Sequence, residues 1–351
     1  MSTARWWHAL DGGKVQCDLC PRACRLRDGQ RGTCFVRANT GGRLELTTYG
    51  RVSGFAVDPV EKKPLYHVAP GARVLSFGTA GCNLACRFCQ NWELSAARSL
   101  DGLTRPAGPS EVADLARAQG CAGVAYTYND PVIFAEYALD VAQAVHEAGL
   151  LNIAVTAGSI NPTPRAEFFA AMDAANIDLK SFDAGFYRRL CGGRLDAVLD
   201  TLRYVVRETS CWVEVTTLVI PGRNDSDAEL TALAGWLVDE LGPTVPWHVT
   251  AFHPDHQMRD VPPTPLATLR RARQIGLDAG LAFVYTGNLP DPDGSTTRCP
   301  ACRASLVERD GYRVGRVAVT PDGRCGECGA AVPGRWEHPA SAKSAPAHPH
   351  R

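Results

Sequence analysis

Three cysteines in one short segment are the residues best placed to do chemistry. Cys82, Cys86 and Cys89 stand in the run GCNLACRFCQN, with gaps of three and two residues, directly after a β-branched segment. Thiolates hold iron–sulfur clusters, and a four-iron cubane usually takes four of them. No fourth cysteine is close in the sequence, so three ligands would leave one iron open for chemistry. Structural zinc sites usually pair two C-x2-C or C-x4-C knuckles, and this spacing is not of that kind.

Two further groups each contain four cysteines. The C-terminal group forms two C-x2-C knuckles, which predicts a closed structural zinc ribbon: Cys299, Cys302, Cys325 and Cys328. The N-terminal group has gaps of two, three and nine: Cys17, Cys20, Cys24 and Cys34. Its segment is too small for a core of its own, which indicates a metal staple. Zinc is our first expectation there, and an auxiliary iron–sulfur cluster is the alternative.

Three cysteines stand alone: Cys121, Cys191 and Cys211. We expect them to be small buried hydrophobic residues. With 37 basic and 37 acidic residues, the chain has no net charge that would favour nucleic acid or a membrane surface. Its N-terminus lacks a signal-like apolar run, and no segment has the length of a membrane-spanning helix. We therefore expect a cytoplasmic protein, in a compartment that keeps thiols reduced.

The elements that must position these residues follow from an alternating pattern. Short apolar segments rich in β-branched residues alternate with amphipathic segments; they lie at 74–79, 123–128, 152–156, 177–180, 212–220, 248–252 and 282–285. Asp130 followed by Pro131 is typical of a helix start, as is Thr163 followed by Pro164. Alternation predicts a parallel sheet with right-handed crossovers, either a barrel or a doubly wound open sheet. Functional residues would then lie at the C-terminal ends of the strands.

We predict an α/β fold, a partial (β/α) barrel with small cysteine-rich metal-binding modules at both ends. The divisions that we expect are an N-terminal cysteine-rich module at 1–45, a bridge at 46–70, the barrel at 71–290, a zinc-ribbon-like module at 295–335 and a tail at 336–351. The tail is rich in Ala, Pro, Ser and His, a composition that favours disorder.

The motif around the three central cysteines resembles that of the radical S-adenosylmethionine (SAM) superfamily. C-x3-C-x2-C follows the first barrel strand, with an aromatic residue, Phe88, before the last cysteine. GCNLACRFCQN resembles the pyruvate formate-lyase activating-enzyme group. The whole chain, from about residue 15 to 335, is similar to the radical enzyme of the AmmeMemoRadiSam system; the bridge EKKPLYH and TYND before Pro131 fit that family.

The resemblance implies a set of cofactor contacts. Relatives commonly place a Gly-Gly-Glu-type turn where this chain has Tyr128, Asn129 and Asp130, so the chain departs from the pattern. Asp130 could still receive the methionine ammonium, or it could serve only as the cap of the next helix. Asp178 and Lys180 lie in a DLK segment like that of the activating enzymes; they could contact the cofactor or form an ion pair. Ile220 and Gly222 lie in a turn that relatives use to cradle adenine.

Other polar residues have weaker patterns. Lys62, Lys63, Tyr66 and His67 form a polar patch before the barrel. It could receive an anionic substrate, although solvated lysines are the simpler interpretation. Asn288 follows the last strand and is a candidate on the substrate side, as is His253 after the strand before it.

The function that the resemblance implies is reductive cleavage of SAM at a 4Fe–4S cluster. The resulting 5′-deoxyadenosyl radical would abstract a hydrogen from a substrate. Activation of a glycyl-radical or other protein partner is one such reaction, and modification of a small molecule or RNA is the alternative. The expected partners are a flavodoxin- or ferredoxin-type electron donor and, by family resemblance, Memo-like and AMMECR-type proteins. The rival from another class is a non-catalytic metal-binding scaffold.

Overall fold

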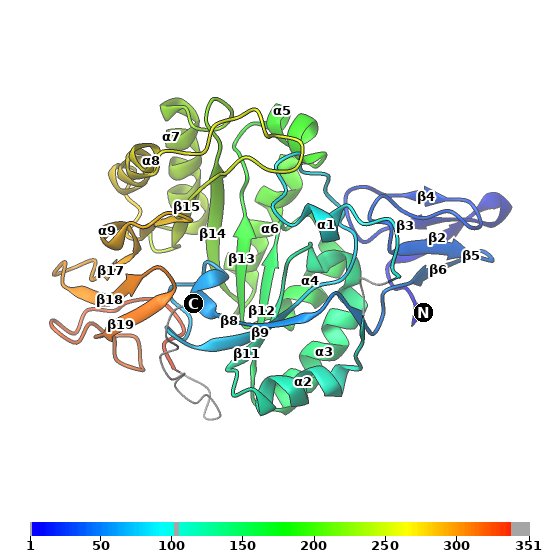
Figure 1. Cartoon of the computed structure of the whole chain (residues 1–351), viewed down its shortest axis with the longest axis horizontal. Coiled ribbons are helices and arrows are strands. Elements are labelled where there is room, and N and C mark those ends of the chain that lie inside the picture. Colours follow the sequence, from blue (N-terminus) through cyan, green and yellow to red (C-terminus); the bar gives the residue numbers. More distant parts are fainter. Residues whose placement is uncertain (1, 102–104, 338–351) are drawn as a thin grey trace.

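The computed structural model describes residues 2–101 and 105–337 (Figure 1). Its main element is an eight-stranded sheet. In spatial order the strands are β16 (Val284–Gly287), β15 (Trp247–Ala251), β14 (Trp212–Val219), β13 (Ala174–Asp178), β12 (Leu151–Thr156), β11 (Gly123–Tyr126), β9 (Arg73–Phe77) and β8 (Phe55–Pro59). β16 and β8 end this order, so the sheet is open, as in a partial barrel. Seven strands are parallel, and β8 pairs antiparallel with β9.

One principal helix follows each parallel strand up to β15. These helices are α2 (Pro109–Ala118), α3 (Ala135–Glu147), α4 (Pro162–Ala170), α6 (Leu195–Glu208), α7 (Asp227–Trp236) and α8 (Leu266–Asp278). Figure 1 shows them packed along the sheet. Short helices α1 (Trp92–Ser95), α5 (Ala184–Phe186) and α9 (Pro292–Ser295) lie at connections. The predicted α/β fold with sequential parallel strands is confirmed, and the chain order of the strands brings their C-terminal ends to one rim.

Helix starts show where local signals decide the structure. The Asp130 side chain accepts a hydrogen bond from the backbone N–H of Val132, with Pro131 at the first position of a 3-10 turn that leads into α3. That start agrees with the prediction. The prediction for α4 was two residues late, because Asn161 and Pro162 begin that helix. Two Pro residues stand in its first turn, and either can occupy an early helical position.

The N-terminal segment forms two small antiparallel sheets beside the barrel. One contains β1 (Ser2–Thr3), β6 (Arg43–Leu46) and β5 (Arg37–Thr40), and the other β2 (Trp7–Leu10), β3 (Lys14–Cys17) and β4 (Arg25–Leu26). Two further short strands, β7 (Arg51–Val52) and β10 (Arg105–Pro106), pair with each other. The buried residues of this segment, Val15 and Leu44 among them, belong to the same core cluster as the barrel helices. The N-terminal segment therefore shares a hydrophobic core with the barrel and is not joined to it by the chain alone.

The C-terminal module is a three-stranded sheet on the opposite side of the barrel (Figure 1). Its strands are β17 (Thr297–Arg298), β18 (Ser305–Asp310) and β19 (Arg313–Val317). Arg309, 3% exposed, donates to the carbonyl of Tyr66 at 2.6 Å and lies 4.1 Å from the centre of that ring. The bridge residues therefore attach the module to the barrel.

The polar patch of the bridge is more buried than a solvated patch would be. Lys63 is 2% exposed and donates to Asp58 at 2.7 Å, whereas Lys62 donates to the other oxygen of the same carboxylate. The Glu214 carboxylate accepts from the backbone N–H groups of Tyr66 and His67. Solvated lysines were thus the wrong interpretation for Lys63.

Among the residues that the structure describes, no helix combines the length and the apolar character that a membrane span requires. The tail that we predicted to be disordered falls, from residue 338, outside these residues.

Candidate active site

The loop that carries the three central cysteines connects β9 to α1. Backbone hydrogen bonds hold it from outside: Ala85 N–H donates to Cys191 at 2.8 Å and Arg87 N–H donates to Leu190 at 2.8 Å. Gly78 and Gly81 permit its close packing. A side-chain carbon on Gly78 would lie 2.4 Å from the carbonyl oxygen of Thr127, so only glycine fits there.

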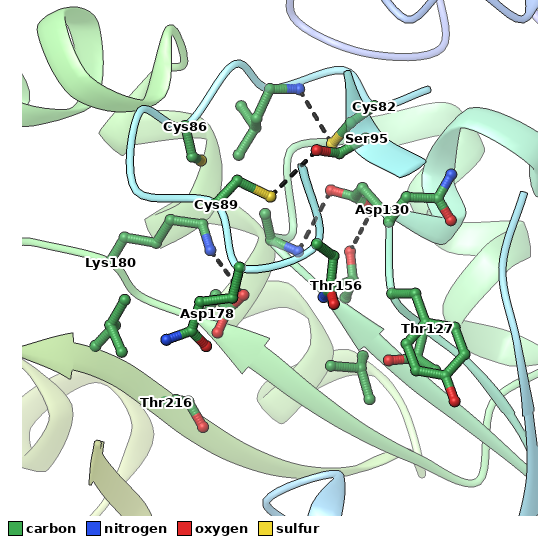
Figure 2. A pocket seen from close by; sticks show the side chains of 18 of the residues that line it. Cys82, Cys86, Cys89, Ser95, Thr127, Asp130, Thr156, Asp178, Lys180 and Thr216 are labelled. Atoms are coloured by element: carbon green, nitrogen blue, oxygen red, sulfur yellow. Dashed lines mark hydrogen bonds and ion pairs between the residues drawn. The ribbon is translucent and has the colours of Figure 1, made fainter. Parts of the chain in front are cut away.

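All three cysteines line one cavity at the C-terminal ends of the parallel strands (Figure 2). Its volume is ≈ 280 Å³, and it is walled by residues from the bridge, the cysteine loop and the ends of β11 to β16. The predicted site residues that line it are Cys82, Cys86, Phe88, Cys89, Asn129, Asp130, Asp178, Lys180 and Asn288. The structure therefore brings most of the candidates to one place.

Asp130 can both cap the following helix and offer its carboxylate to a ligand ammonium. Besides capping the helix start, its carboxylate accepts from the Thr156 hydroxyl at 2.8 Å and from Ala157 N–H at 3.3 Å. Burial raises the pKa of this carboxyl to about 6 in spite of those hydrogen bonds. A buried carboxylate at a cavity wall would be stabilised by a ligand ammonium.

Asn129 lines the cavity, but its side chain makes its hydrogen bonds to the cysteine loop. Its amide NH₂ donates to the carbonyl of Gly81 at 2.7 Å, and its oxygen accepts from Thr79 N–H at 3.1 Å. These bonds attach the end of β11 to the start of the loop, so Asn129 acts on the cysteines through the backbone.

Lys180 and Asp178 form an ion pair at the end of β13. The Lys180 ammonium donates to Asp178 at 2.8 Å, with 15% of the lysine side chain exposed and 31% of the aspartate. Burial alone would lower the pKa of Lys180, but the Asp178 carboxylate and the nearby thiols hold it well above its usual value. A fixed positive charge thus faces the cavity near Cys86.

Three predicted residues lie away from this arrangement. Ile220 is fully buried, and its N–H donates to the Asn224 side chain at 2.7 Å. Gly222 is exposed at a positive φ of 68°, and a side-chain carbon placed there would have nothing within 4 Å of it. Neither lines the cavity, so a contact to adenine stays a prediction. His253 is exposed and lies outside the cavity as well.

The structure adds residues that the sequence did not single out. Thr216 lies opposite Asp178 on β14 and lines the cavity. Its hydroxyl is buried without a hydrogen-bond partner among the residues described. Cys191 contacts Cys86, whose pKa is raised first by a hydrogen bond between the two thiols and then by burial. No sequence pattern links positions 86 and 191, because only the loop packing joins them.

The observations fit an iron–sulfur cluster with SAM. Three thiols share the cavity, where burial disfavours free thiolates and metal binding would offset that cost. An orphaned hydroxyl, a carboxylate and an ammonium line the same walls, which suits a ligand with both amino and carboxylate groups.

The C-terminal cysteines come closest together. Their four ligand atoms lie within 4.8 Å of one another, with Cys299 Sγ 3.7 Å from Cys328 Sγ and Cys302 Sγ 3.7 Å from Cys325 Sγ. Tetrahedral zinc with Zn–S bonds of about 2.3 Å sets its sulfurs about 3.8 Å apart. This cluster can bind a metal, and its spacing fits a single ion.

Comparisons with known proteins agree with this arrangement. The model of the Radical SAM superfamily matches residues 77–234, from the end of β9 into α7. The chain is also 40% identical over 309 residues to the uncharacterized protein MJ0808 of Methanocaldococcus jannaschii, a match that covers 88% of this chain and 92% of that protein. The chain therefore contains a domain of the radical SAM superfamily. Membership implies an iron–sulfur cluster and SAM as cofactors, and it supports an enzyme.

Solved structures with a similar fold include a domain of pyruvate-formate lyase-activating enzyme from Bacteroides vulgatus. That match has 18% identity and a TM-score of 0.43, and it covers 48% of this chain and 99% of that one. Streptococcus suis SuiB bound to precursor peptide SuiA matches with 15% identity and a TM-score of 0.49, over 65% of this chain and 51% of that one.

Proposed function

We propose that the chain reductively cleaves SAM and uses the product to abstract a hydrogen atom from a substrate. The observation that carries the proposal is the shared cavity, in which three thiols of one loop face Asp130 and the Lys180–Asp178 pair. Three thiolates would leave one iron of a bound cubane open. When bound, the cluster and SAM would supply a 5′-deoxyadenosyl radical. The chain's own residues would bind, orient and shield these groups.

The charged residues would contact different groups of SAM. The Asp130 carboxylate would accept the methionine ammonium, and the Lys180 ammonium would stabilise a carboxylate. Asp178, at the other end of the ion pair, and Thr216 are placed to accept and donate hydrogen bonds to hydroxyl groups. Asn129 would keep the cysteine loop in position for both. Two opposite charges on facing walls would fix which way the ligand lies.

A second cavity is our candidate for the substrate site. It has a volume of ≈ 320 Å³ and lies between the barrel and the C-terminal module, with walls that include Tyr66, His248 and Tyr312. Lys62, Pro64, Thr250 and Asn288 line both cavities, so the two adjoin. A volume of this size suits a small molecule or one side chain of a larger partner.

The wall formed by the C-terminal module supports one substrate class over the other. Modification of a small molecule is favoured, because the C-terminal module walls the second cavity. Activation of a glycyl-radical or other protein partner is the second candidate, and it would need a protein loop to enter the same cavity. In either case a flavodoxin- or ferredoxin-type donor would supply one electron per cleavage, in the reducing cytoplasm. Memo-like and AMMECR-type proteins are proposed partners by family resemblance alone.

The test is anaerobic turnover. The protein, reconstituted with iron and sulfide and reduced with dithionite, should convert SAM to 5′-deoxyadenosine, measured by chromatography. The variant C82A/C86A/C89A should form none. Equal product from the two proteins would contradict the proposal. So would a wild-type protein that carries a full, reducible cluster but fails to bind SAM in anaerobic calorimetry.

A further inference from the structure

The four N-terminal cysteines surround one small cavity in the structure. Cys17 ends β3, Cys20 and Cys24 lie in the following turn, and Cys34 precedes β5. All four line the cavity. A side-chain carbon at Gly32 would lie 3.7 Å from the sulfurs of both Cys24 and Cys34. The cysteines that are far apart in this segment therefore converge, as ligands of one metal group must.

Their spacing differs from that of the C-terminal cysteines. Among the His, Cys, Asp and Glu residues that the structure describes, only the Cys299 group brings three or more ligand atoms within 4.8 Å of one another. Sulfurs around one zinc ion must lie that close. In a cubane each thiolate binds a different iron, so the sulfurs stand farther apart. The cysteines of the Cys82 loop, which belong to a radical SAM motif, likewise do not bring three sulfurs within 4.8 Å of one another.

The surroundings of the N-terminal site are built for a buried anionic group. Cys17, Cys20 and Cys34 are each at most 8% exposed, and Arg37 is 1% exposed. The Arg37 guanidinium pairs with Glu136 and lies close enough to Cys17 and Cys34 for electrostatic interaction. Arg22 also lines the cavity. Four thiolates bound to any metal would keep a net negative charge, which needs such a buried cation.

The N-terminal cysteine site packs directly against the loop that carries Cys82, Cys86 and Cys89. Asn83, next to Cys82, lines its cavity, and Arg22 donates to the carbonyl of Asn83 at 2.9 Å. Gly81 approaches the backbone of Cys34 so closely that a side-chain carbon would lie 2.0 Å from that carbonyl oxygen. The two cysteine sites therefore share one packed wall.

We propose that Cys17, Cys20, Cys24 and Cys34 hold an auxiliary four-iron cluster rather than zinc. Each chain would then carry two clusters and one zinc ion, with zinc confined to the C-terminal module. The N-terminal thiols, like those of the Cys82 loop, lack the mutual approach within 4.8 Å that the zinc-type group shows, and this difference selects the cluster. The metal at this site can be identified whether or not the chain cleaves SAM.

The experiment removes the other iron site first, because variants of the N-terminal cysteines risk misfolding. The chain C82A/C86A/C89A, reconstituted anaerobically, is analysed for iron, acid-labile sulfide and zinc. We expect about four irons and four sulfides per chain, about half of the wild-type content. The reduced variant should show the electron paramagnetic resonance signal of a 4Fe–4S cluster. A chain with about two zinc ions and no sulfide would overturn the proposal.

Two further variants in that background assign the metals. Adding C20A should remove iron and sulfide and leave zinc at about one per chain. Adding C299S, the matched control, should remove zinc and leave iron and sulfide unchanged. The sulfide content also distinguishes a cubane, which contains sulfide, from a single iron ion bound by the C-terminal thiolates, which does not. Iron and sulfide that followed Cys299 instead of Cys20 would overturn the assignment.

Discussion

Lys180 lies 2.8 Å from Asp178, two residues away on the same face of a strand end, and both side chains reach the cavity of the three cysteines. Side chains at i and i+2 of an extended segment point the same way. The pair therefore presents a cation and an anion next to each other at one rim. A ligand with a carboxylate can take the ammonium, while the aspartate keeps the lysine in place.

Lys180→Met should weaken SAM binding without loss of iron. Loss of a charge-assisted hydrogen bond costs about 1.5–3 kcal/mol, so the Kd should rise about 10- to 100-fold, as measured by anaerobic calorimetry. Lys14→Met is the control, because Lys14 is exposed on β3 and its variant should bind as the wild type does. An unchanged Kd in Lys180→Met would remove Lys180 from the site.

Thr216→Val tests the orphaned hydroxyl. Valine keeps the shape of threonine and removes the group that finds no partner among the described residues. We expect the Kd for SAM to rise about fivefold, the equivalent of about 1 kcal/mol, with no loss of stability. Thr201→Val is matched, since the Thr201 hydroxyl is equally buried and unpartnered but lies on α6, away from the cavity. If the Thr216→Val and Thr201→Val proteins have the same Kd for SAM, the Thr216 hydroxyl has no role in binding.

Cys191→Ala asks whether a fourth thiol completes the catalytic cluster. Cys191 contacts Cys86 in the structure, yet the open iron needs only three protein ligands. The variant should keep the wild-type iron content and SAM cleavage, whereas Cys86→Ala should lose about half of the iron on the two-cluster assignment. A matching loss of iron in Cys191→Ala would show that four thiolates, not three, hold this cluster.

The sequence predicted the repeating part of the molecule better than its connections. Strand positions follow from local apolar patterns, and all seven predicted segments overlap the parallel strands. The rim location of the cysteine loop follows from that topology. In contrast, Thr216 and Cys191 look like ordinary core residues in sequence, and only packing brings Thr216 to the cavity and Cys191 to Cys86. The burial of Lys63 was missed for the same reason, because it depends on contacts with Asp58 of β8 and with the Tyr128 ring.

His67 provides a pH-dependent link between the barrel and the C-terminal module. Its ring is fully buried, with Nδ1 2.6 Å from the carbonyl oxygen of Pro333 and Nε2 2.7 Å from the Tyr285 hydroxyl. Burial lowers the pKa of His67 to about 4 from an ordinary 6.5. Above pH 6.5 the side chain is neutral in both the folded and the unfolded chain, so it adds no pH dependence there.

As the pH falls from 6.5 to 4, the unfolded chain binds a proton at His67 that the folded chain does not. The free energy of unfolding should therefore fall by about 3 kcal/mol over this range on account of His67 alone. His67→Gln keeps polar atoms in place but cannot titrate, so its loss of stability on acidification, measured by urea unfolding, should be smaller by that amount. Thr201→Val, a buried substitution on α6 that replaces no titratable group, is the control and should keep the wild-type slope. Release of metal in acid acts on all three proteins and cancels in the comparison; equal slopes for His67→Gln and wild type would contradict the link.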